Sequence, residues 1–503
     1  MQEFPQVTLD TTLAELYNRG GPVDDDGQLA LLLCAANSEV APTSKLARNT
    51  KYLYQDSTFS NTPDDIDPQK QEEIEKSVAV KYLSLVPQHD AFAAGNMPVI
   101  LFDSDDSKKT FDHSKTEAER TIHSLTAAQR PKLLFFSDPT QISLKENGIS
   151  RLATKMEFDE VEGLPLALDL DTHYFLNSKA ALCTSGLPSP KATLLELEDY
   201  SVEAEKCCGV CRSGSSRIAI PSECTGPRGR WLEKQITRLM SRISSQRLPF
   251  VLKNQQTFGG GGTFVVSSPE DLRQLQDALS TRILPKLLSQ VNSSNAHLKP
   301  ATLILSDMVT DPVSDCGLTF FVTKSGECIF LALTQQIVDS TKAWIGSIIS
   351  YPEQQNFKKR FTPLMTQIGA WLSQHGYYGP CGADILESAP RETDRSAATQ
   401  LNIVDLNVRT SGSLVLALLS THFSAQRGLH TASSFSINAE MSRDAFVAKF
   451  EQRFREGRMV VVSWYEDPES GVSYGNVVIG ARDEKSLEEE VARVKEVASE
   501  VCF

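Results

Sequence analysis

A short run of alternating polar and apolar residues in the last quarter of the chain is its most constraining feature. Asp405, Asn407 and Arg409 are spaced by two, with apolar residues between them. On a β-strand such residues share one face. A buried strand carries three neighbouring polar groups only where they have partners, so the pattern predicts a site on a sheet. The alternative is a strand whose polar face points to solvent.

These residue types indicate what the site could bind. Aspartate and asparagine oxygens are hard ligands suited to Mg²⁺. The planar guanidinium of Arg409 suits a carboxylate or a phosphate. A second predicted strand near 381–386 contains Asp384. If the two strands form a hairpin, Asp384 and Asp405 can share a metal ion, and we expect Asp384, Asp405 and Asn407 to be its ligands.

Four consecutive glycines, Gly259–Gly262, lie between predicted strands at 249–253 and 263–266. A glycine run between two strands excludes the Walker loop and the dinucleotide fingerprint, because both lead into a helix. A flexible hairpin flap remains, with Lys253 on its first strand. Backbone amides and a lysine are suited to clamping a triphosphate. A simple flexible turn is the alternative, and the local pattern does not decide between the two.

Composition limits the class of protein and its partners. The chain has 503 residues, enough for about three domains. Its net charge is −14, which disfavours nucleic acid and anionic membrane surfaces as partners. No segment reaches the ~20 apolar residues of a membrane span, and the first residues do not resemble a signal peptide. We therefore expect a cytoplasmic protein with reduced cysteines.

One group of cysteines has two interpretations. Cys207, Cys208, Cys211 and Cys224 lie close together in sequence, and the spacing of Cys208 and Cys211 is that of a zinc knuckle. A structural zinc site usually has two well-spaced pairs, and the second pair is missing. The spacing therefore favours a loop of unpaired thiols over a zinc site.

The order of predicted elements indicates an α/β fold in three parts. We expect an N-terminal α/β domain at 1–168, with strands at 97–103 and 132–136. A central domain at 169–430 contains a flap subdomain at about 190–305, and a small α/β extension occupies 431–503. Apolar spacing predicts helices at 363–375, ending at Gly376, and at 486–500.

The order of motifs resembles the ATP-grasp superfamily of carboxylate–amine ligases. Lys179 precedes a Gly-Leu-Pro-Ser-Pro segment, Lys253 precedes the glycine run, and a hinge strand ending at 306–309 comes before the acidic motifs. The likeness spans about 170–428, and the N-terminal region resembles the pre-ATP-grasp domain. Within the superfamily, the chain resembles the fungal ATP-grasp proteins described as solid-state-culture specific.

The resemblance implies ATP and Mg²⁺ as cofactors and a role for each motif. The residues implied to bind the nucleotide are Lys179 and Lys253 on the phosphates, Gly259, Gly260, Gly261 and Gly262 over them, and Ser306, Asp307, Met308 and Val309 around the adenine. It also implies Asp384, Asp405 and Asn407 as metal ligands, with Arg409 and Lys253 acting in catalysis. Two positions depart from the family: Asp405 and Ser306 stand where Glu is common. A ribose-binding Glu is expected after the hinge, and Asp315 is the acid nearest that place.

The implied reaction joins a small-molecule carboxylate, such as an amino acid, to an amine through an acyl phosphate. An ATP-binding regulatory protein without catalysis and an ATP-grasp-type phosphotransferase are the alternatives. His375 and His422 are candidates for accepting a proton from the amine, although a lone histidine more often has a structural role. Trp344, Gly346 and Ser347 are candidates for an acceptor pocket, with core packing an equal interpretation for Trp344. The C-terminal piece either packs against the site or supports a homodimer.

Overall fold

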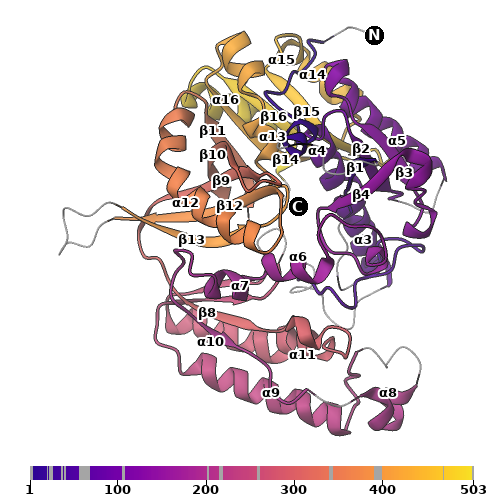
Figure 1. The fold of residues 1–503 in the computed structure, drawn as a ribbon, viewed down its shortest axis with the longest axis vertical. Helices are drawn as coiled ribbons and strands as arrows, with labels where there is room; N and C mark the ends of the chain where they lie inside the picture. The colour runs from indigo at the N-terminus through magenta and orange to yellow at the C-terminus, as the bar shows by residue number, and fades with distance from the viewer. Residues whose placement is uncertain are drawn as a thin grey trace.

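The computed structural model describes residues 4–19, 21, 27–34, 38, 41–55, 68–104, 108–200, 203–213, 219–257, 261–338, 344–389, 399–467 and 470–500. These residues form a mixed α/β fold with one parallel sheet and two antiparallel sheets (Figure 1). The predicted α/β class is confirmed. Among the described helices, none has the length and apolar character required to cross a membrane.

The N-terminal sheet is parallel and has the strand order β3-β2-β1-β4. Its strands are β1 (Gln28–Leu32), β2 (Pro98–Phe102), β3 (Lys132–Phe136) and β4 (Ile149–Thr154). The helices of this region are α1 (Leu13–Asn18), α3 (Pro68–Ala79), α4 (Val86–Phe92) and α5 (Lys108–His123), with a π-helical turn at Val80–Leu85 joining α3 to α4. Every residue of β2 is buried, as expected for a strand covered on both faces.

The small sheet is antiparallel and has the order β5-β8-β6-β7. Its strands are β5 (Ala192–Leu195), β6 (Phe250–Asn254), β7 (Thr263–Val266) and β8 (Leu303–Asp307). Its helices are α8 (Gly209–Arg212), α9 (Pro227–Ser244), α10 (Pro269–Ala278) and α11 (Leu284–Ser289), with a π-helical turn at Leu279–Ile283. These elements form the lower part of the molecule in Figure 1 and lie almost entirely within the range expected for the flap subdomain.

The large sheet is antiparallel and has the order β13-β12-β9-β10-β11-β14-β16-β15. Its strands are β9 (Pro312–Val322), β10 (Cys328–Val338), β11 (Trp344–Ser350), β12 (Gly379–Ser388), β13 (Gln400–Asn407), β14 (Thr431–Ala439), β15 (Met459–Glu466) and β16 (Ser473–Ala481), with β17 (Ser499–Glu500) paired to β14. The described strands after residue 430 therefore belong to the large sheet, whereas the sequence suggested a small α/β extension at 431–503.

The longest helix, α12 (Gln354–Gln374), packs on β9 and β10. The sequence placed its start at Pro363, and this was wrong: the helix begins nine residues earlier and carries Pro363 in its interior. An interior proline removes one backbone hydrogen bond. The buried face, which includes Phe361, Ile368 and Leu372, stabilises the helix despite this loss. The expected end at Gly376 is confirmed, because this glycine has a φ of +76°.

Six further described helices lie between strands: the first two join the N-terminal sheet to the small sheet, and the other four lie between strands of the large sheet. These are α6 (Leu170–Leu176), α7 (Lys179–Thr184), α13 (Leu414–Ala417), α14 (Arg443–Lys449), α15 (Glu451–Arg455) and α16 (Glu484–Lys495). The helix predicted at 486–500 thus ends five residues early and is followed by β17. Ser178 caps α7 by accepting from the backbone N–H of Ala181, which divides 170–184 into two helices.

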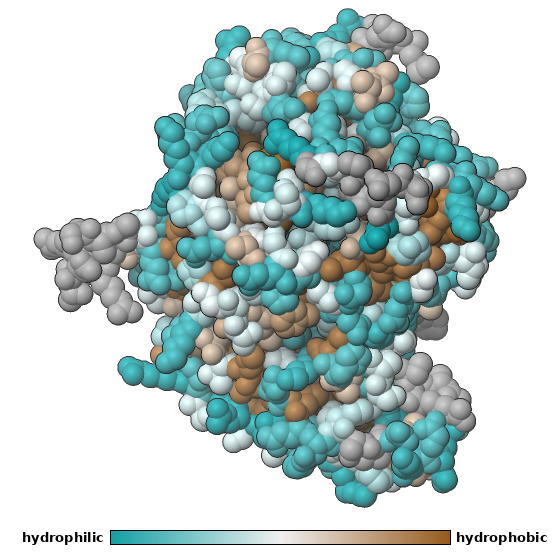
Figure 2. Space-filling view, viewed as in Figure 1, coloured by the Kyte–Doolittle hydropathy of each residue, from teal (hydrophilic) through white to brown (hydrophobic). Residues whose placement is uncertain are grey.

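The N-terminal region packs against the C-terminal strands. Helices α4 and α5 contact β15, and the buried Arg443 donates to Glu117 of α5 at 2.9 Å. The first and last parts of the chain therefore lie side by side in the upper half of Figure 1. The face shown in Figure 2 is mainly hydrophilic, in keeping with the net charge of −14.

Candidate active site

A cavity of about 580 Å³ lies between the small sheet and the large sheet. The small sheet contributes side chains from β6, β7 and β8, and the large sheet contributes β9, β12 and β13. The loop at 409–413, strands β10, β11, β14 and β16, and Val86, His89 and Lys155 of the N-terminal region also contribute. The cavity is large enough for a small-molecule ligand. Its acidic lining residues include Asp384 on β12 and Asp405 on β13.

Two aspartates face each other on the paired strands β12 and β13. Asp384 and Asp405 are direct partners in the antiparallel register, and both line the cavity. The side-chain amide of Gln336 donates to one oxygen of Asp384, and that of Asn407 donates to the other at 3.4 Å. The hairpin considered from the sequence is present, and it brings the two carboxylates together.

The pair is electrostatically uneven. Burial and the negative charge of Asp405 raise the pKa of Asp384 to about 7, and Asp315 adds to this effect. Burial alone would also raise the pKa of Asp405, but the positive charges of Lys179 and Lys253 outweigh it and lower that pKa. Asp405 is therefore the ionised member of the pair, and Asp384 lacks equivalent compensation.

Two lysines lie beside the carboxylates, on the side of the small sheet. Lys179, the first residue of α7, lies 3.4 Å from an oxygen of Asp405 and donates to the hydroxyl of Thr257 at 2.8 Å. Lys253, on β6, donates to the backbone carbonyl of Val404 at 2.6 Å. Burial lowers the pKa of Lys253, and the nearby Lys179 adds to this effect. Lys253 lines the cavity, and Lys179 is buried against Asp405. Positive charges clustered beside a cavity favour a polyanionic group such as a phosphate chain.

The donor set of the carboxylate end fits a divalent cation. Asp384, Asp405 and Asn407 offer hard oxygens within one cavity, and the repulsion between the aspartates is what a bound cation would relieve. Asp315, on β9 opposite Leu386, also lines the cavity and acts on the pKa of Asp384. Asp315 follows the hinge in the sequence, and in the structure it also adds negative charge beside Asp384.

Arg409 follows the end of β13 and is buried, with 9% of its surface exposed. Its guanidinium donates to the side-chain oxygen of Asn177 at 2.9 Å, and the same oxygen accepts from the backbone N–H of Val408. Asn177 lies at the carboxyl end of α6, so this helix fixes the direction of the arginine. The guanidinium is held at the cavity wall, where it can contact an anionic ligand.

A second buried charged group also borders the cavity. Lys155 donates to Asp90 at 2.5 Å and to the hydroxyl of Thr410 at 2.9 Å, and that hydroxyl donates to Asp90 at 2.8 Å. His89 lies 3.5 Å from Asp90. Lys155, His89 and Thr410 all line the cavity. Opposite charges are matched here, so this group fixes the wall formed by the N-terminal region.

The hinge and flap residues border the same cavity. Ser306, Asp307, Met308 and Val309 line it at the end of β8. Gly259 and Gly260 lie outside the described residues. Gly261 and Gly262 precede β7, and the β6–β7 hairpin expected around the glycine run is present. Gly262 has a φ of +69°, and a Cβ there would lie 2.6 Å from the side chain of Asn254, so this position favours glycine.

Neither histidine candidate lies among the described residues that line the cavity. His375 ends α12 and bonds to the carbonyl of Trp371 at 2.9 Å. His422 is fully buried and bonds to the carbonyl of Gly457 at 2.9 Å. Burial and the charge of Arg427 lower the pKa of His422 to about 4. Both histidines have structural partners, which is the role that a lone histidine more often has.

Several residues that shape the site were not predicted as site residues. Gln336 and Asn177 hold Asp384 and Arg409 from elements distant in sequence, and no local pattern marks them. Lys155 follows β4 directly, at the edge of a parallel sheet where ligands usually bind. Recognising 149–154 as a strand would have drawn attention to it.

Comparison with known proteins gives structural likenesses only. No protein-family model matches the chain, and no curated protein matches it in sequence. The ADP complex of an N5-carboxyaminoimidazole ribonucleotide synthetase has 11% identity and a TM-score of 0.47, over 94% of this chain and 96% of the other. A carboxyaminoimidazole ribonucleotide synthase from Aspergillus clavatus with ATP has 11% identity and a TM-score of 0.45, over 94% and 98%.

An L-amino acid ligase from Bacillus licheniformis has 12% identity and a TM-score of 0.44, over 81% of this chain and 99% of the other. The identities and TM-scores of all three are low. The likenesses therefore carry no weight for the chemistry proposed for this chain.

Proposed function

We propose that this protein is an ADP-forming ligase with an ATP-grasp type of site. It uses ATP and Mg²⁺ to activate a substrate carboxylate as an acyl phosphate and joins it to an amine. One observation carries this proposal: Asp384 and Asp405 face each other in a cavity that Lys253 also lines, and Lys179 lies 3.4 Å from Asp405. Carboxylates for a cation beside lysines for phosphates are the groups that a magnesium nucleotide needs.

The nucleotide would lie between the two sheets. Met308 and Val309 at the end of β8, with Val251 on β6, give the small-sheet side an apolar wall for the adenine. Lys179 and Lys253 then bind the phosphates, and the flap that includes Gly261 and Gly262 covers them. Covering the phosphates excludes water, which would otherwise hydrolyse an acyl phosphate.

The metal ligands in this proposal are Asp384, Asp405 and Asn407. Bound Mg²⁺ would neutralise negative charge on the phosphates during transfer. Gln336 and Asn407 hold Asp384 in place by hydrogen bonds to its two oxygens. Lys179 keeps Asp405 ionised by its positive charge. Asp315, which also lines the cavity, adds negative charge beside Asp384.

The chemistry then proceeds in two steps. A carboxylate oxygen of the acid attacks the terminal phosphorus of ATP, the bond to ADP breaks, and an acyl phosphate forms. The amine nitrogen attacks the carbonyl carbon, phosphate leaves, and the nitrogen loses a proton. Arg409, held by Asn177, stabilises the negative charge of the acyl phosphate. The protein's main contribution is to position the reactants and to stabilise charge.

The far wall of the cavity suggests the kind of acid and amine. Ser347 on β11, Ser434 and Ser436 on β14, and Asn476 on β16 offer small polar groups, and Lys155 lies nearby among the lining residues. This wall suits a small polar substrate, such as an amino acid or a related acid. The strands after residue 430 therefore complete the substrate pocket in this proposal. An ATP-dependent reaction is consistent with a cytoplasmic location and with a homodimer.

A screen for ADP release tests the proposal. The full chain is incubated with ATP, Mg²⁺ and pools of acids and amines, and product masses are measured. We expect ADP, phosphate and an amide from at least one pair, and no turnover in Asp405→Ala. Asp277→Ala, at an exposed position of α10, serves as the matched control.

Other outcomes identify the alternatives. Release of AMP contradicts the acyl phosphate. A stable phosphorylated product indicates a phosphotransferase. Binding of ATP without turnover across a broad screen indicates a regulatory protein.

A further inference from the structure

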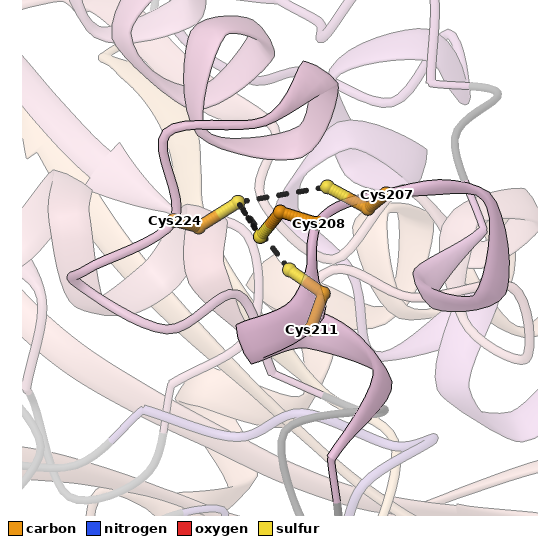
Figure 3. Close-up of side chains that lie close together, drawn as sticks. All are labelled: Cys207, Cys208, Cys211 and Cys224. Atoms are coloured by element: carbon orange, nitrogen blue, oxygen red, sulfur yellow. Dashed lines mark hydrogen bonds between the residues drawn. The ribbon is translucent and has the colours of Figure 1, made fainter.

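The four cysteines that the sequence left as a loop of unpaired thiols converge at the edge of the small sheet's subdomain. Cys207, Cys208 and Cys211 lie in and before α8, and Cys224 approaches from the other side of the connection to α9 (Figure 3). All four sulfur atoms lie within 4.8 Å of one another. Cys211 and Cys224 are buried, and the other two are half-buried.

We propose that Cys207, Cys208, Cys211 and Cys224 bind one zinc ion. In a tetrahedral site with Zn–S bonds of about 2.3 Å, neighbouring sulfurs lie about 3.8 Å apart. The sulfur of Cys224 lies 3.6 Å from that of Cys207, 3.7 Å from that of Cys208 and 3.3 Å from that of Cys211. The three distances from Cys224 are thus close to the spacing that zinc requires, and all four sulfurs lie within 4.8 Å of one another.

The start of α9 donates hydrogen bonds to this group. The backbone N–H of Arg228 donates to the sulfur of Cys207, and those of Gly226 and Gly229 donate to the sulfur of Cys224. These N–H groups belong to the first turn of an 18-residue helix, where they have no partner within the helix. Hydrogen bonds to coordinating sulfurs are a usual feature of metal sites, because they orient the ligands.

The glycines in this turn make room for the sulfurs. A Cβ on Gly226 would lie 2.6 Å from the sulfur of Cys207, and a Cβ on Gly229 would lie 1.7 Å from the carbonyl oxygen of Cys224. Real Cβ contacts are essentially never this short. The turn can therefore approach the cysteines this closely because it has glycine at both positions.

A buried arginine provides charge compensation. Arg228 is 1% exposed, and its guanidinium donates to the sulfur of Cys211 and to Tyr200. Four thiolates around Zn²⁺ carry a net charge of −2. A positive group in contact with the cluster offsets part of that charge, and a buried arginine needs such a partner.

The site would stabilise a long irregular connection. Residues 196–226 join β5 to α9, and their described part contains only the short helical turns Ala204–Lys206 and Gly209–Arg212. The segment contributes Ala204, Cys211, Ile220 and Cys224 to the apolar core of the subdomain, and a metal ion would add a cross-link between Cys224 and the cysteines at 207–211. Among the described residues lining the large cavity, none comes from this cysteine group. The zinc is therefore structural and separate from the proposed nucleotide site.

Disulfide bonding is the competing chemistry for these residues. A disulfide requires two sulfurs about 2.05 Å apart, and four cysteines can form one or two such bonds. Here Cys224 lies at similar distances from three other sulfurs, which is the geometry of shared coordination rather than of one pair.

Metal analysis of the full chain tests the proposal. The protein is purified under reducing conditions without added metal, and its zinc content is measured by mass spectrometry. We expect about one zinc per chain, released when a mercurial reagent titrates the thiols. Exchange with Co²⁺ should give the intense visible and near-ultraviolet absorption of tetrahedral cobalt thiolate.

Variants locate the metal. Cys208→Ser and Cys224→Ser should lose the zinc, whereas Cys328→Ser, a half-buried cysteine on β10, should retain it. Asp384→Asn should also retain it, which separates this site from the proposed nucleotide site. If the cluster variants do not fold, the Co²⁺ spectrum of the wild type decides.

Four results would overturn the proposal. These are a wild-type protein free of zinc, zinc that persists in Cys224→Ser, zinc lost in Asp384→Asn, or a disulfide among the four cysteines in the reduced preparation.

Discussion

The two candidate metal sites of this protein differ in donors, enclosure and origin. Asp384 and Asp405 offer oxygens on two paired strands, and they face a cavity of about 580 Å³. The cysteine group offers four sulfurs from an irregular connection, packed within the small sheet's core and against a helix start. Catalytic metal sites keep positions open to substrate, whereas structural sites are closed. By this criterion, the carboxylate site is suited to a metal ion that exchanges ligands with substrate, and the cysteine group is suited to a metal ion that stabilises the connection.

The largest expected effect concerns the open site. Asp405→Asn removes the ionised member of the carboxylate pair, so ADP formation should fall about 10³-fold with whichever acid and amine support turnover. Steady-state ADP release measures this. Asp277→Asn should leave the rate unchanged. Equal rates in wild type and Asp405→Asn would show that the open site is not the reaction centre.

The lysines should affect affinity for the nucleotide. Lys253→Met removes a positive charge beside Asp405, so the dissociation constant for ATP should rise about 50-fold. Calorimetric titration of ATP with Mg²⁺ measures it, and Lys359→Met on the exposed face of α12 is the control. Unchanged affinity would place the phosphates elsewhere in the cavity.

The open site should also make the cation-free protein sensitive to pH. The pKa of Asp384 rises from 3.8 to about 7 on folding, so the folded protein holds a proton that the unfolded chain has released. Its contribution to stability is fully present below pH 3.8 and is lost as the pH rises through 7. Because Asp384 is partly exposed, this contribution is about 2 kcal/mol.

Asp384→Asn should remove this pH dependence. Urea unfolding from pH 4 to pH 8 in the presence of a chelator measures it. Added Mg²⁺ should stabilise the wild type at pH 8 more than the variant. If the free energy of unfolding changed with pH in the same way in the wild type and in Asp384→Asn, the raised pKa assigned to Asp384 would be wrong.

The smallest expected effect concerns the closed site. Gly226→Ala places a Cβ 2.6 Å from the sulfur of Cys207 and should lower the free energy of unfolding by about 1 kcal/mol. It should also reduce zinc content while leaving ATP affinity unchanged. Gly163→Ala is the matched control, because a Cβ there has nothing within 4 Å. Equal zinc content and equal stability in Gly226→Ala and Gly163→Ala would show that Gly226 is not required for the metal site.

The two sites also differ in how far the sequence predicted them. The pairing of Asp384 with Asp405 was predictable because alternation on a strand is local and the two strands are near neighbours in the chain. The cysteine geometry was not, because an irregular connection of about 30 residues brings the four sulfurs together. The spacing of cysteines along the sequence does not predict how close their sulfurs lie when an irregular segment folds back on itself.

The errors in the fold have similar causes. Pro363 suggested the start of a helix, but the buried face of α12 outweighs the lost hydrogen bond. Lys155 and Gln336 reach the cavity through contacts that depend on how distant strands are arranged. The strands after residue 430 have ordinary sequence patterns, and only their pairing shows that they extend the large sheet.

Isotope transfer tests the central claim most directly. The acid identified in the substrate screen is labelled with oxygen-18 in its carboxylate, and the phosphate released with ADP is examined by mass spectrometry. If the carboxylate is activated as an acyl phosphate, one labelled oxygen per turnover passes to phosphate. Phosphate without label, with all of the oxygen-18 retained in the organic product or found in AMP, would contradict the proposed reaction.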